Sequence, residues 1–369
     1  MGEWQRAVGA GMSEGLFADF FAGKRVLVTG HTGFKGGWLC AWLKLLGSDV
    51  AGFALAPHTE PNLFTAIRVG EGLTSIIGDL TDYSALSAAF KTYEPQIVIH
   101  NAAQALVRRS YRQPVETYAT NVMGTVHLLE AARDTSSVRS VVIVTSDKCY
   151  ENREWTRGYR EEDCMGGHDP YSSSKGAAEL VTAAYRRSFF HDDEGAGIAS
   201  ARAGNVIGGG DWSEDRLLPD IVRGITSGAP IIIRRPESVR PWQHVLEPLR
   251  GYLMLAQKLW SDRAKYAEAW NFGPAEKDTV TVTDLAHCVV SRWKGALKIE
   301  PEIGAPHEGQ YLRLDCAKAS RQLGWRPVLT LNQALDWTVE WYRSYYNNPE
   351  TAQSLTIRQI QQYMTAAEV

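Results

Sequence analysis

Short apolar runs alternate with longer amphipathic segments over the first two hundred residues of the chain. Runs rich in β-branched and aliphatic residues predict strands at residues 25–29, 50–54, 74–77, 97–100, 141–145 and 198–202. Intervening segments predict helices at residues 36–46, 83–93, 121–133 and 171–187. Strands that are apolar on both faces and alternate with helices are typical of a parallel sheet covered on both sides. The sequence therefore predicts the α/β class, with a doubly wound parallel sheet.

This regular alternation ends near residue 205. Beyond it, short apolar runs at 231–233 and 270–272 lie among helices and loops. We expect a smaller, mixed α/β domain there, which binds the substrate and closes over the cleft. The expected organisation is a short, partly ordered leader at 1–21, the sheet domain at 22–205 with later segments returning to it, the second domain mainly at 206–350, and a C-terminal tail at 351–369.

A glycine-rich segment joins the first predicted strand to the first predicted helix, and it reads Gly30-His31-Thr32-Gly33-Phe34-Lys35-Gly36. In the Rossmann turn, separate glycines permit the tight turn, the approach of backbone to pyrophosphate, and the packing of helix on strand. The amides of the helix N-terminus then bind the phosphate oxygens. The spacing here is G-x-x-G-x-x-G, which an ordinary strand–helix turn would also explain. His31 and Lys35 either contact pyrophosphate or are simply solvated.

The residues leave the form of the dinucleotide open. An NAD site usually offers an acid at the end of the second strand, to hold the ribose hydroxyls. Residues 52–56 contain no acid and have no arginine nearby, so NAD and NADP both fit. Asp79 follows the third strand, where it either accepts a hydrogen bond from the adenine amino group or caps a turn or helix.

Three residues form the candidate catalytic group of the sheet domain. Tyr171 and Lys175 are four residues apart, so on a helix they share one face. Ser146 ends a central strand, where ligands of parallel sheets usually bind. A nearby ammonium stabilises a phenolate, and a serine hydroxyl can bond both the phenol and a substrate hydroxyl. The group predicts an alcohol–ketone conversion beside a nicotinamide.

Asp147 and Lys148 follow Ser146 directly and extend this chemistry. A buried carboxyl that keeps its proton can act as an acid, and a lysine in a closed cationic site can act as a base near neutral pH. The alternative is that Asp147 is a turn residue and Lys148 its surface partner. The first interpretation predicts a reaction beyond simple oxidation.

Composition excludes several classes of function. The chain has 369 residues, 44% of them hydrophobic, and a net charge of -3, which does not favour binding to nucleic acid or to a membrane surface. Five cysteines without a Cys-x-x-Cys pair indicate a reducing compartment, no disulfide framework and no metal site. No apolar run approaches the length of a membrane span, and the first 20 residues do not resemble a secretory signal. We expect a cytoplasmic enzyme.

Longer motifs carry a resemblance to a known family. They are G-H-T-G-F-K-G at 30–36, H-N-A-A-Q at 100–104, T-S-D-K-C-Y at 145–150, D-P-Y-S-S-S-K at 169–175, R-A-G-N-V-I-G-G-G-D-W at 202–212 and R-P-W-Q-H-V at 240–245. With these motifs the chain resembles the extended short-chain dehydrogenase/reductase family, and within it the CDP-glucose branch of the nucleotide-sugar 4,6-dehydratases. The similarity extends from about residue 23 to the last forty residues.

The resemblance implies a lyase that converts CDP-D-glucose to CDP-4-keto-6-deoxy-D-glucose and water, with NAD unchanged overall. Tyr171 would deprotonate the 4-hydroxyl while the hydrogen on carbon 4 passes to NAD as hydride. Asp147 would protonate the departing 6-hydroxyl. Lys148 would be the base at carbon 5, although related dTDP-glucose enzymes carry glutamate at this position.

The resemblance also implies binding residues and partners. The cofactor would be held by Gly30, Thr32, Gly33, Phe34, Lys35, Gly36, Asp79, Leu80, Ala102 and Ala103. The nucleotide sugar would be held by Gln104, Asn205, Arg216, Leu217 and Arg240, of which Arg216, Arg240 and Asn205 fit the diphosphate, although a surface ion pair or a loop cap would also explain them. Asn121 is interpreted as structural. The family implies a homodimer built through a four-helix interface, and a role in deoxysugar supply for bacterial surface polysaccharide such as O-antigen.

Two alternatives stay open. A nucleotide-sugar 4-epimerase of the same family would use Ser146, Tyr171 and Lys175 alike, but would not need an acid and a base at 147 and 148. A non-catalytic dinucleotide sensor would keep the glycine turn and typically lack the tyrosine–lysine pair. How cytosine would be distinguished from other bases does not follow from the sequence.

Overall fold

The computed structural model describes residue 4 and residues 15–191, 195–231, 233, 236–293 and 311–368, with the side chain of residue 277 excepted. In these residues seven parallel strands form one sheet, in the order β3-β2-β1-β4-β5-β6-β9. They are β1 (Arg25–Thr29), β2 (Asp49–Ala54), β3 (Thr74–Ile77), β4 (Ile97–His100), β5 (Ser140–Val144), β6 (Gly197–Ala203) and β9 (Ala269–Phe272). The order reverses between β1 and β4. The predicted doubly wound sheet is confirmed, and β1, β3 and β4 have the predicted bounds.

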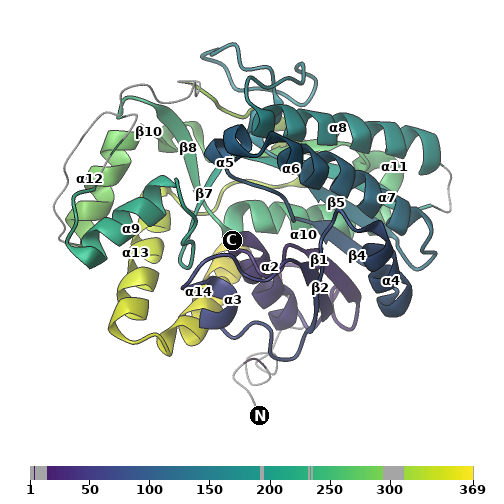
Figure 1. The fold of residues 1–369 in the computed structure, drawn as a ribbon, viewed down its shortest axis with the longest axis horizontal. Helices are drawn as coiled ribbons and strands as arrows, with labels where there is room; N and C mark the ends of the chain where they lie inside the picture. Colours follow the sequence, from purple (N-terminus) through teal and green to yellow (C-terminus); the bar gives the residue numbers. More distant parts are fainter. Residues whose placement is uncertain are drawn as a thin grey trace.

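Helices cover both faces of this sheet because its strands are apolar on both sides. On β1, Val26 and Val28 join one buried cluster, whereas Leu27, pointing the other way, joins a second. The first cluster contains α2 (Phe34–Leu45), α10 (Leu246–Ser261) and α14 (Thr351–Ala367). The second contains α4 (Tyr83–Tyr93), α7 (Gly124–Arg133) and α8 (Pro170–Phe189), which lie together in Figure 1. The sheet is thus the middle layer of three.

The second domain has its own small sheet, as predicted. Within the described chain, β7 (Asn205–Ile207) pairs with β8 (Val239–His244) in parallel, and β8 pairs with β10 (Thr279–Thr281) antiparallel. Around it lie α9 (Leu217–Ser227), α12 (Val282–Trp293) and α13 (Leu331–Asn347) (Figure 1). Ile231 and Ile233 of the predicted apolar run are buried there, and residue 232 lies outside the described residues.

The expectation that the run at 270–272 belongs to the second domain is wrong. These residues form β9, which pairs with β6 in parallel at the edge of the large sheet. Trp270 and Phe272 are fully buried there, and local apolarity did not reveal which sheet they would join. The shorter elements are α3 (Leu63–Ala66), α5 (Val107–Arg112), α6 (Pro114–Tyr118), α11 (Arg263–Tyr266), π-helical turns at Ala119–Met123 and Ala319–Leu323, and single helical turns at Asp147–Cys149 and Glu276–Asp278.

Both ends of the described chain pack on the sheet domain. Phe17 and Phe21 of the segment expected as a leader are buried, as is Trp4, whereas residues 1–3 and 5–14 of that segment lie outside the described residues. At the other end, Tyr363 of α14 contacts the ring of Trp42, edge to face. In the described part of the chain, every helix is too short or too polar to traverse a lipid bilayer.

Candidate active site

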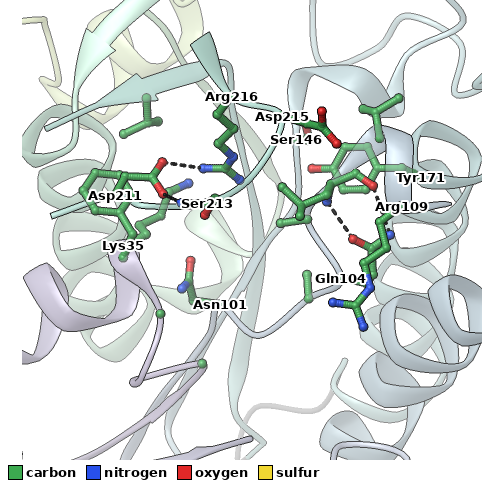
Figure 2. A pocket seen from close by; sticks show the side chains of 18 of the residues that line it. Lys35, Asn101, Gln104, Arg109, Ser146, Tyr171, Asp211, Ser213, Asp215 and Arg216 are labelled. Carbon is green, nitrogen blue, oxygen red and sulfur yellow. Dashed lines mark hydrogen bonds and ion pairs between the residues drawn. The ribbon is translucent and has the colours of Figure 1, made fainter. Parts of the chain in front are cut away.

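A large cavity of about 590 Å³ lies at the carboxyl ends of the sheet strands. Its lining combines the glycine turn and the ends of β2, β4 and β5 with residues of the second domain. This is the switch point of the strand order, where ligands of doubly wound sheets bind. Figure 2 shows the two sides facing each other, with Lys35 and Arg216 on one side and Ser146 and Tyr171 on the other.

The glycine turn has the close backbone contacts that a dinucleotide-binding turn requires. Gly30 has a φ of +76°, and a Cβ there would lie 2.8 Å from the Cα of Ala102. A Cβ on Gly36 would overlap the carbonyl oxygen of Gly30, so this glycine lets α2 pack on the turn. Gly33 is the N-cap of α2 and lines the cavity. The helix amides therefore face the space where a pyrophosphate would lie.

The other predicted cofactor residues gather around the same end of the cavity. Gly36 lies behind the turn, and the remaining nine line the cavity: Gly30, Thr32, Gly33, Phe34, Lys35, Asp79, Leu80, Ala102 and Ala103. Thr32 donates to the carbonyl oxygen of Leu55 at 2.8 Å, which fixes the turn against the end of β2. Asp79 accepts from the amide of Thr81 at 2.8 Å, so it does cap a turn, and its place in the lining keeps the adenine contact as a prediction.

Neither interpretation of His31 was right. Its side chain is completely buried, and Nε2 lies 2.8 Å from the hydroxyl of Ser75, away from the cavity. The ring fills the space left by Gly52, where a Cβ would overlap it. Burial lowers the pKa of His31 to about 4, so it is neutral at physiological pH.

Lys35 is not freely solvated either. Its Nζ lies 3.3 Å from the hydroxyl of Tyr252, and the residue lines the cavity. Burial, then the positive charges of Arg216 and Lys175, lower the pKa of Lys35 to about 7. A dianionic pyrophosphate beside it would reverse this shift, so the position fits the predicted phosphate contact.

Tyr171 is fixed by the first turn of α8. Asp169 caps this helix by accepting from the amide of Ser172 at 2.9 Å, and the amide of Tyr171 donates to the hydroxyl of Ser110 at 3.1 Å. The phenol is buried and lines the cavity, and burial raises its pKa to about 12. The hydrogen bond with Ser146 and the positive charge of Arg216 act against this rise and favour the phenolate.

Lys175 lies one turn later on the same buried face of α8. Its Nζ donates to the carbonyl oxygen of Val144 at 3.3 Å, and burial lowers its pKa to about 8. The negative charge of Glu179 is the largest opposing influence on this pKa. An ammonium has three donors, so Lys175 can hold a carbonyl and still serve a ligand.

Asp147 and Lys148 both line the cavity, as the catalytic interpretation requires. The Ser146 hydroxyl accepts from the Lys148 amide at 3.2 Å and donates to the Asp147 carboxylate at 3.0 Å, which shapes a tight turn after β5. Asp147 is only 3% exposed. Burial raises the pKa of its carboxyl above the usual range, and Lys148, Ser146 and Arg240 oppose this. Lys148 is half-buried.

The side chain of Gln104 secures its own loop. Its amide donates to the carbonyl of Leu106 at 3.1 Å and to Thr117 at 2.9 Å, and its oxygen accepts from the amide of Leu106 at 2.7 Å. Gln104 also lines the cavity, so the sugar contact stays a prediction. Asn121 is structural, as predicted: it bonds both backbone groups of Gln104 and the hydroxyl of Ser174.

The predicted diphosphate residues all line the cavity: Asn205, Arg216, Leu217 and Arg240. Arg216 pairs with Asp211 at 3.1 Å, and Asp211 also accepts from the amide of Ser213 at 3.0 Å (Figure 2). Arg240 is buried, and its charge lowers the pKa of Asp147. Two cations thus line the part of the cavity that the second domain contributes.

Sequence reasoning missed the residues that hold these groups in place. Asp211 orients Arg216, and the capping residue Asp169 sets the start of α8. Both residues belong to motifs quoted above, at 202–212 and 169–175. Their position next to functional residues could have identified them as supporting residues. Asp215 pairs with Arg108 at 4.0 Å and so links the second domain to α5, a contact between distant segments that no local pattern announces.

A doubly wound sheet, a glycine turn, and a serine, tyrosine and lysine at the switch point define a protein of the short-chain dehydrogenase/reductase class. The sequence pattern that defines the GDP-mannose 4,6-dehydratase family matches residues 27–338 of this chain. The chain belongs to this family.

Individual relatives narrow the comparison. The chain is 50% identical over 354 residues to CDP-glucose 4,6-dehydratase of Salmonella typhimurium, covering 94% of this chain and 98% of that protein. It is similar to UDP-glucose 4-epimerase of Thermus thermophilus, solved with NAD, with a TM-score of 0.75, 25% identity, and coverage of 86% of this chain and 99% of the other. The dTDP-glucose 4,6-dehydratase of Streptomyces venezuelae has the same fold, with a TM-score of 0.75, 24% identity, and coverage of 90% and 99%.

Proposed function

We propose that the protein is an NAD-dependent lyase that converts CDP-D-glucose to CDP-4-keto-6-deoxy-D-glucose and water. The observation that carries this proposal is the buried carboxyl of Asp147, which lines the same cavity as Tyr171 and the glycine turn. The identity of 50% to a CDP-glucose 4,6-dehydratase supports the choice of nucleotide sugar.

NAD fits the residues of the glycine turn. The N-terminus of α2, capped by Gly33, lies at the cavity, and Lys35 adds a cation beside it. Leu55 and Ala56 line the cavity beyond β2 and offer no charge to a ribose phosphate, which favours NAD over NADP. When bound, NAD supplies the acceptor for the hydrogen on carbon 4 of the sugar and later returns it to carbon 6.

Tyr171 is the base for the sugar's 4-hydroxyl. Its phenolate accepts that proton, the Ser146 hydroxyl turns from Asp147 to bond the phenolate oxygen, and Arg216 and Lys175 supply positive charge. The resulting 4-ketone makes the proton on carbon 5 acidic, because its removal gives an enolate.

Asp147 and Lys148 then eliminate water. Lys148 removes the carbon-5 proton, and the electron pair forms the carbon 5–carbon 6 double bond as the carbon–oxygen bond at carbon 6 breaks. Asp147 supplies the proton to the leaving oxygen. Its raised pKa keeps that proton on the carboxyl at a pH where an exposed aspartate would be ionised.

Arg216 and Arg240 bind the diphosphate, and Asn205 adds an amide. Guanidinium groups match phosphate oxygens in charge and geometry. Asp211 holds Arg216 in its orientation through the 3.1 Å ion pair, so the cation meets the ligand without first losing rotamer freedom. Leu217, at the start of α9, lies against the same ligand.

A homodimer through the helices of the sheet domain completes the proposal. Large apolar side chains are exposed on α5, α6, the following π-helical turn and α8: Tyr111, Val115, Tyr118, Met123, Leu180 and Phe189. These elements lie next to one another in Figure 1. A patch of this kind on neighbouring helices is typical of a protein interface. The cytoplasm, where nucleotide sugars are made, is the proposed location.

The decisive experiment incubates the purified protein with NAD and a panel of CDP-, UDP-, dTDP- and GDP-glucose. A product lighter than CDP-glucose by one water, carrying a 4-keto group, is expected from CDP-glucose. In D2O, one deuteron should enter at carbon 5. A galacto-configured product of unchanged mass would favour a 4-epimerase, and no reaction with any member of the panel would reject both enzymes.

A further inference from the structure

A buried ion pair lies directly behind the catalytic group. Glu179 of α8 and Arg202 of β6 pair at 2.8 Å, and each side chain is only 4% exposed. Burying two charges is costly unless the pair is well hydrogen-bonded, so such a pair is weak evidence for stability alone. Its location calls for another reason.

The carboxylate of Glu179 is saturated with donors. Its Oε2 accepts from Ser200 at 2.6 Å and from Arg202, and its Oε1 accepts from the hydroxyl of Thr145. Thr145 is the neighbour of Ser146, and Ser200 and Arg202 belong to the strand that leads to Gly204. One buried carboxylate thus joins α8, the end of β5 and β6 immediately beneath the cavity.

Arg202 has partners of its own. Its Nη1 donates to the hydroxyl of Tyr150 at 2.7 Å, and that hydroxyl donates to Asn271 at 2.8 Å. Tyr150 ends the segment that begins with Asp147. The pair is therefore fixed on both sides and cannot turn toward solvent.

Glu179 stands four residues after Lys175, so the two side chains share the buried face of α8. The charged or titratable groups around Lys175 are Glu179 on its own helix, Cys149 after β5, Lys35 of α2 and His100 of β4. Around Glu179 they are Arg202 and Cys149, with Arg186 further along α8. Glu179 is the largest influence that favours the charge of Lys175, and Arg202 lowers the pKa of Glu179, so that this carboxylate stays ionised beside the positive charge of the arginine.

We propose that Glu179 is a positioning residue for the reaction, which keeps Lys175 protonated, and that Arg202 limits how strongly it does so. This inference rests on the proposed function, because it concerns the lysine that acts with Tyr171. The pair would contribute to catalysis indirectly, through Lys175, without contacting the substrate.

The test measures hydride transfer to NAD in single turnovers, followed by the absorbance of reduced nicotinamide between pH 6 and 10. Formation of the Tyr171 phenolate, whose pKa is about 12, makes the rate rise with pH, and loss of the Lys175 proton cancels this rise above its pKa of about 8; this levelling is the alkaline limb of the profile. Glu179→Gln should move this alkaline limb down by about one pH unit or more, since a nearby opposite charge shifts a pKa by that amount. At pH 8.5 a shift of one unit corresponds to a rate about sixfold lower, relative to pH 6.5, than in the wild type.

Arg202→Gln should move the limb in the opposite direction, because it leaves the negative charge of Glu179 unopposed. The double variant Glu179→Gln/Arg202→Gln should lie between the two single variants, and it avoids an unpaired buried charge if a single variant fails to fold. Glu179→Asp keeps the carboxylate and should therefore retain most of the wild-type pH profile. Glu247→Gln, a buried carboxylate of α10 far from Lys175, is the matched control and should leave the limb unmoved.

Equal loss of rate at every pH, or a shift of the same sign in both single variants, would overturn the inference and make the pair purely structural. The readout also separates it from the proposed function, because dehydration and epimerisation both begin with hydride transfer. Wild-type protein that reduces NAD without releasing water would reject the dehydratase and leave this test readable. Wild-type protein that transfers no hydride from any nucleotide hexose would reject both.

Discussion

The carboxylate of Asp147 lies against the backbone of Gly204, so closely that a Cβ on this glycine would be 3.0 Å from Oδ2. Gly204 follows β6, and the cyclic side chain of Pro241 closes its other side at 3.2 Å from the same Cβ position. The acid of the proposed reaction therefore has its position set by the second domain as well as by the turn after β5.

Replacing this glycine should displace the acid. In Gly204→Ala the methyl group would lie 3.0 Å from the Asp147 carboxylate and 3.2 Å from Pro241, so the flexible carboxylate must shift by a few tenths of an ångström. We expect dehydration to fall by about tenfold or more, whereas hydride transfer changes little. Comparing product formation with NAD reduction in single turnovers checks this. Gly273→Ala is the matched control, since its new Cβ would meet the nearest atom at 3.4 Å. Equal activity of the two variants would contradict the prediction.

Asp147→Asn removes the acid without changing its size. The first hydride transfer should survive, whereas water loss should decrease by about 100-fold or more, the usual contribution of a general acid. Reduced nicotinamide should then accumulate on the enzyme with CDP-glucose. Asp262→Asn, which alters an aspartate that caps α11, should leave both steps intact. Parallel loss of both steps in Asp147→Asn would show that its role has been misassigned.

Binding of NAD should take up a proton at Lys35. The pKa of Lys35 is about 7 because of burial and neighbouring cations, and a bound pyrophosphate raises it again. Above pH 7 the free protein has lost this proton and the complex has regained it, so affinity should fall as pH rises, by up to about tenfold per pH unit. Calorimetry in buffers of different ionisation enthalpy measures the uptake. Lys35→Met should abolish the proton uptake, whereas Lys91→Met, at an exposed position of α4, should not. Uptake that persists in Lys35→Met would show that another group binds the proton.

The hydroxyl of Tyr363 should stabilise the attachment of the C-terminal helix. It donates to the buried carboxylate of Glu247 at 2.7 Å, whose other oxygen accepts from the amides of Val328 and Leu329. Tyr363→Phe leaves one carboxylate oxygen unsatisfied, so the free energy of unfolding in urea should fall by about 1–3 kcal/mol. Tyr346→Phe, at a half-exposed hydroxyl, should cost less than this. Equal stability of the two variants would mean that water replaces the lost donor.

The exposed helix patch should hold two copies of the chain together. Val115 is 81% exposed and Leu180 is 61% exposed, on adjacent helices α6 and α8. The double variant Val115→Glu/Leu180→Glu should give a monomer in analytical ultracentrifugation, because apposed carboxylates repel and cannot be desolvated. Ile77→Glu places the same charge on a residue that is 60% exposed at the end of β3. If both variants sediment like the wild type, the dimer uses another surface.

Much of the fold follows from local pattern. The strands of the large sheet before residue 205 are short runs of buried residues between glycines and polar turns, so their positions could be predicted within one or two residues. The capping aspartates Asp82 and Asp169 also stand where two helices begin. The strand β9 could not be placed, because joining β6 rather than β8 depends on packing between distant segments and not on its own four residues.

Only those site residues could be predicted that belong to motifs with a recognisable chemical role. The residues that end strands or begin helices at the switch point do line one cavity. His31 was misjudged, and the structural task of Gln104 was missed, because a polar residue inside a ligand-binding motif can serve the folded chain itself. His31 fills the space beside Gly52, and Gln104 secures its own loop. Local sequence gives no sign of either, since the partners become neighbours only in the folded chain.

The position of β9 has a consequence for how the protein is made. The sheet domain begins at β1, yet its edge strand β9 emerges from the ribosome some 240 residues later, and α14 follows later still. Until β9 is synthesised, β6 is an unpaired edge strand, and until α14 is synthesised, the indole of Trp42 lacks its contact with Tyr363. The sheet domain is therefore begun first but completed only after the second domain has been synthesised. A nascent chain halted at residue 205 would expose the unpaired backbone groups of β6 to other nascent chains.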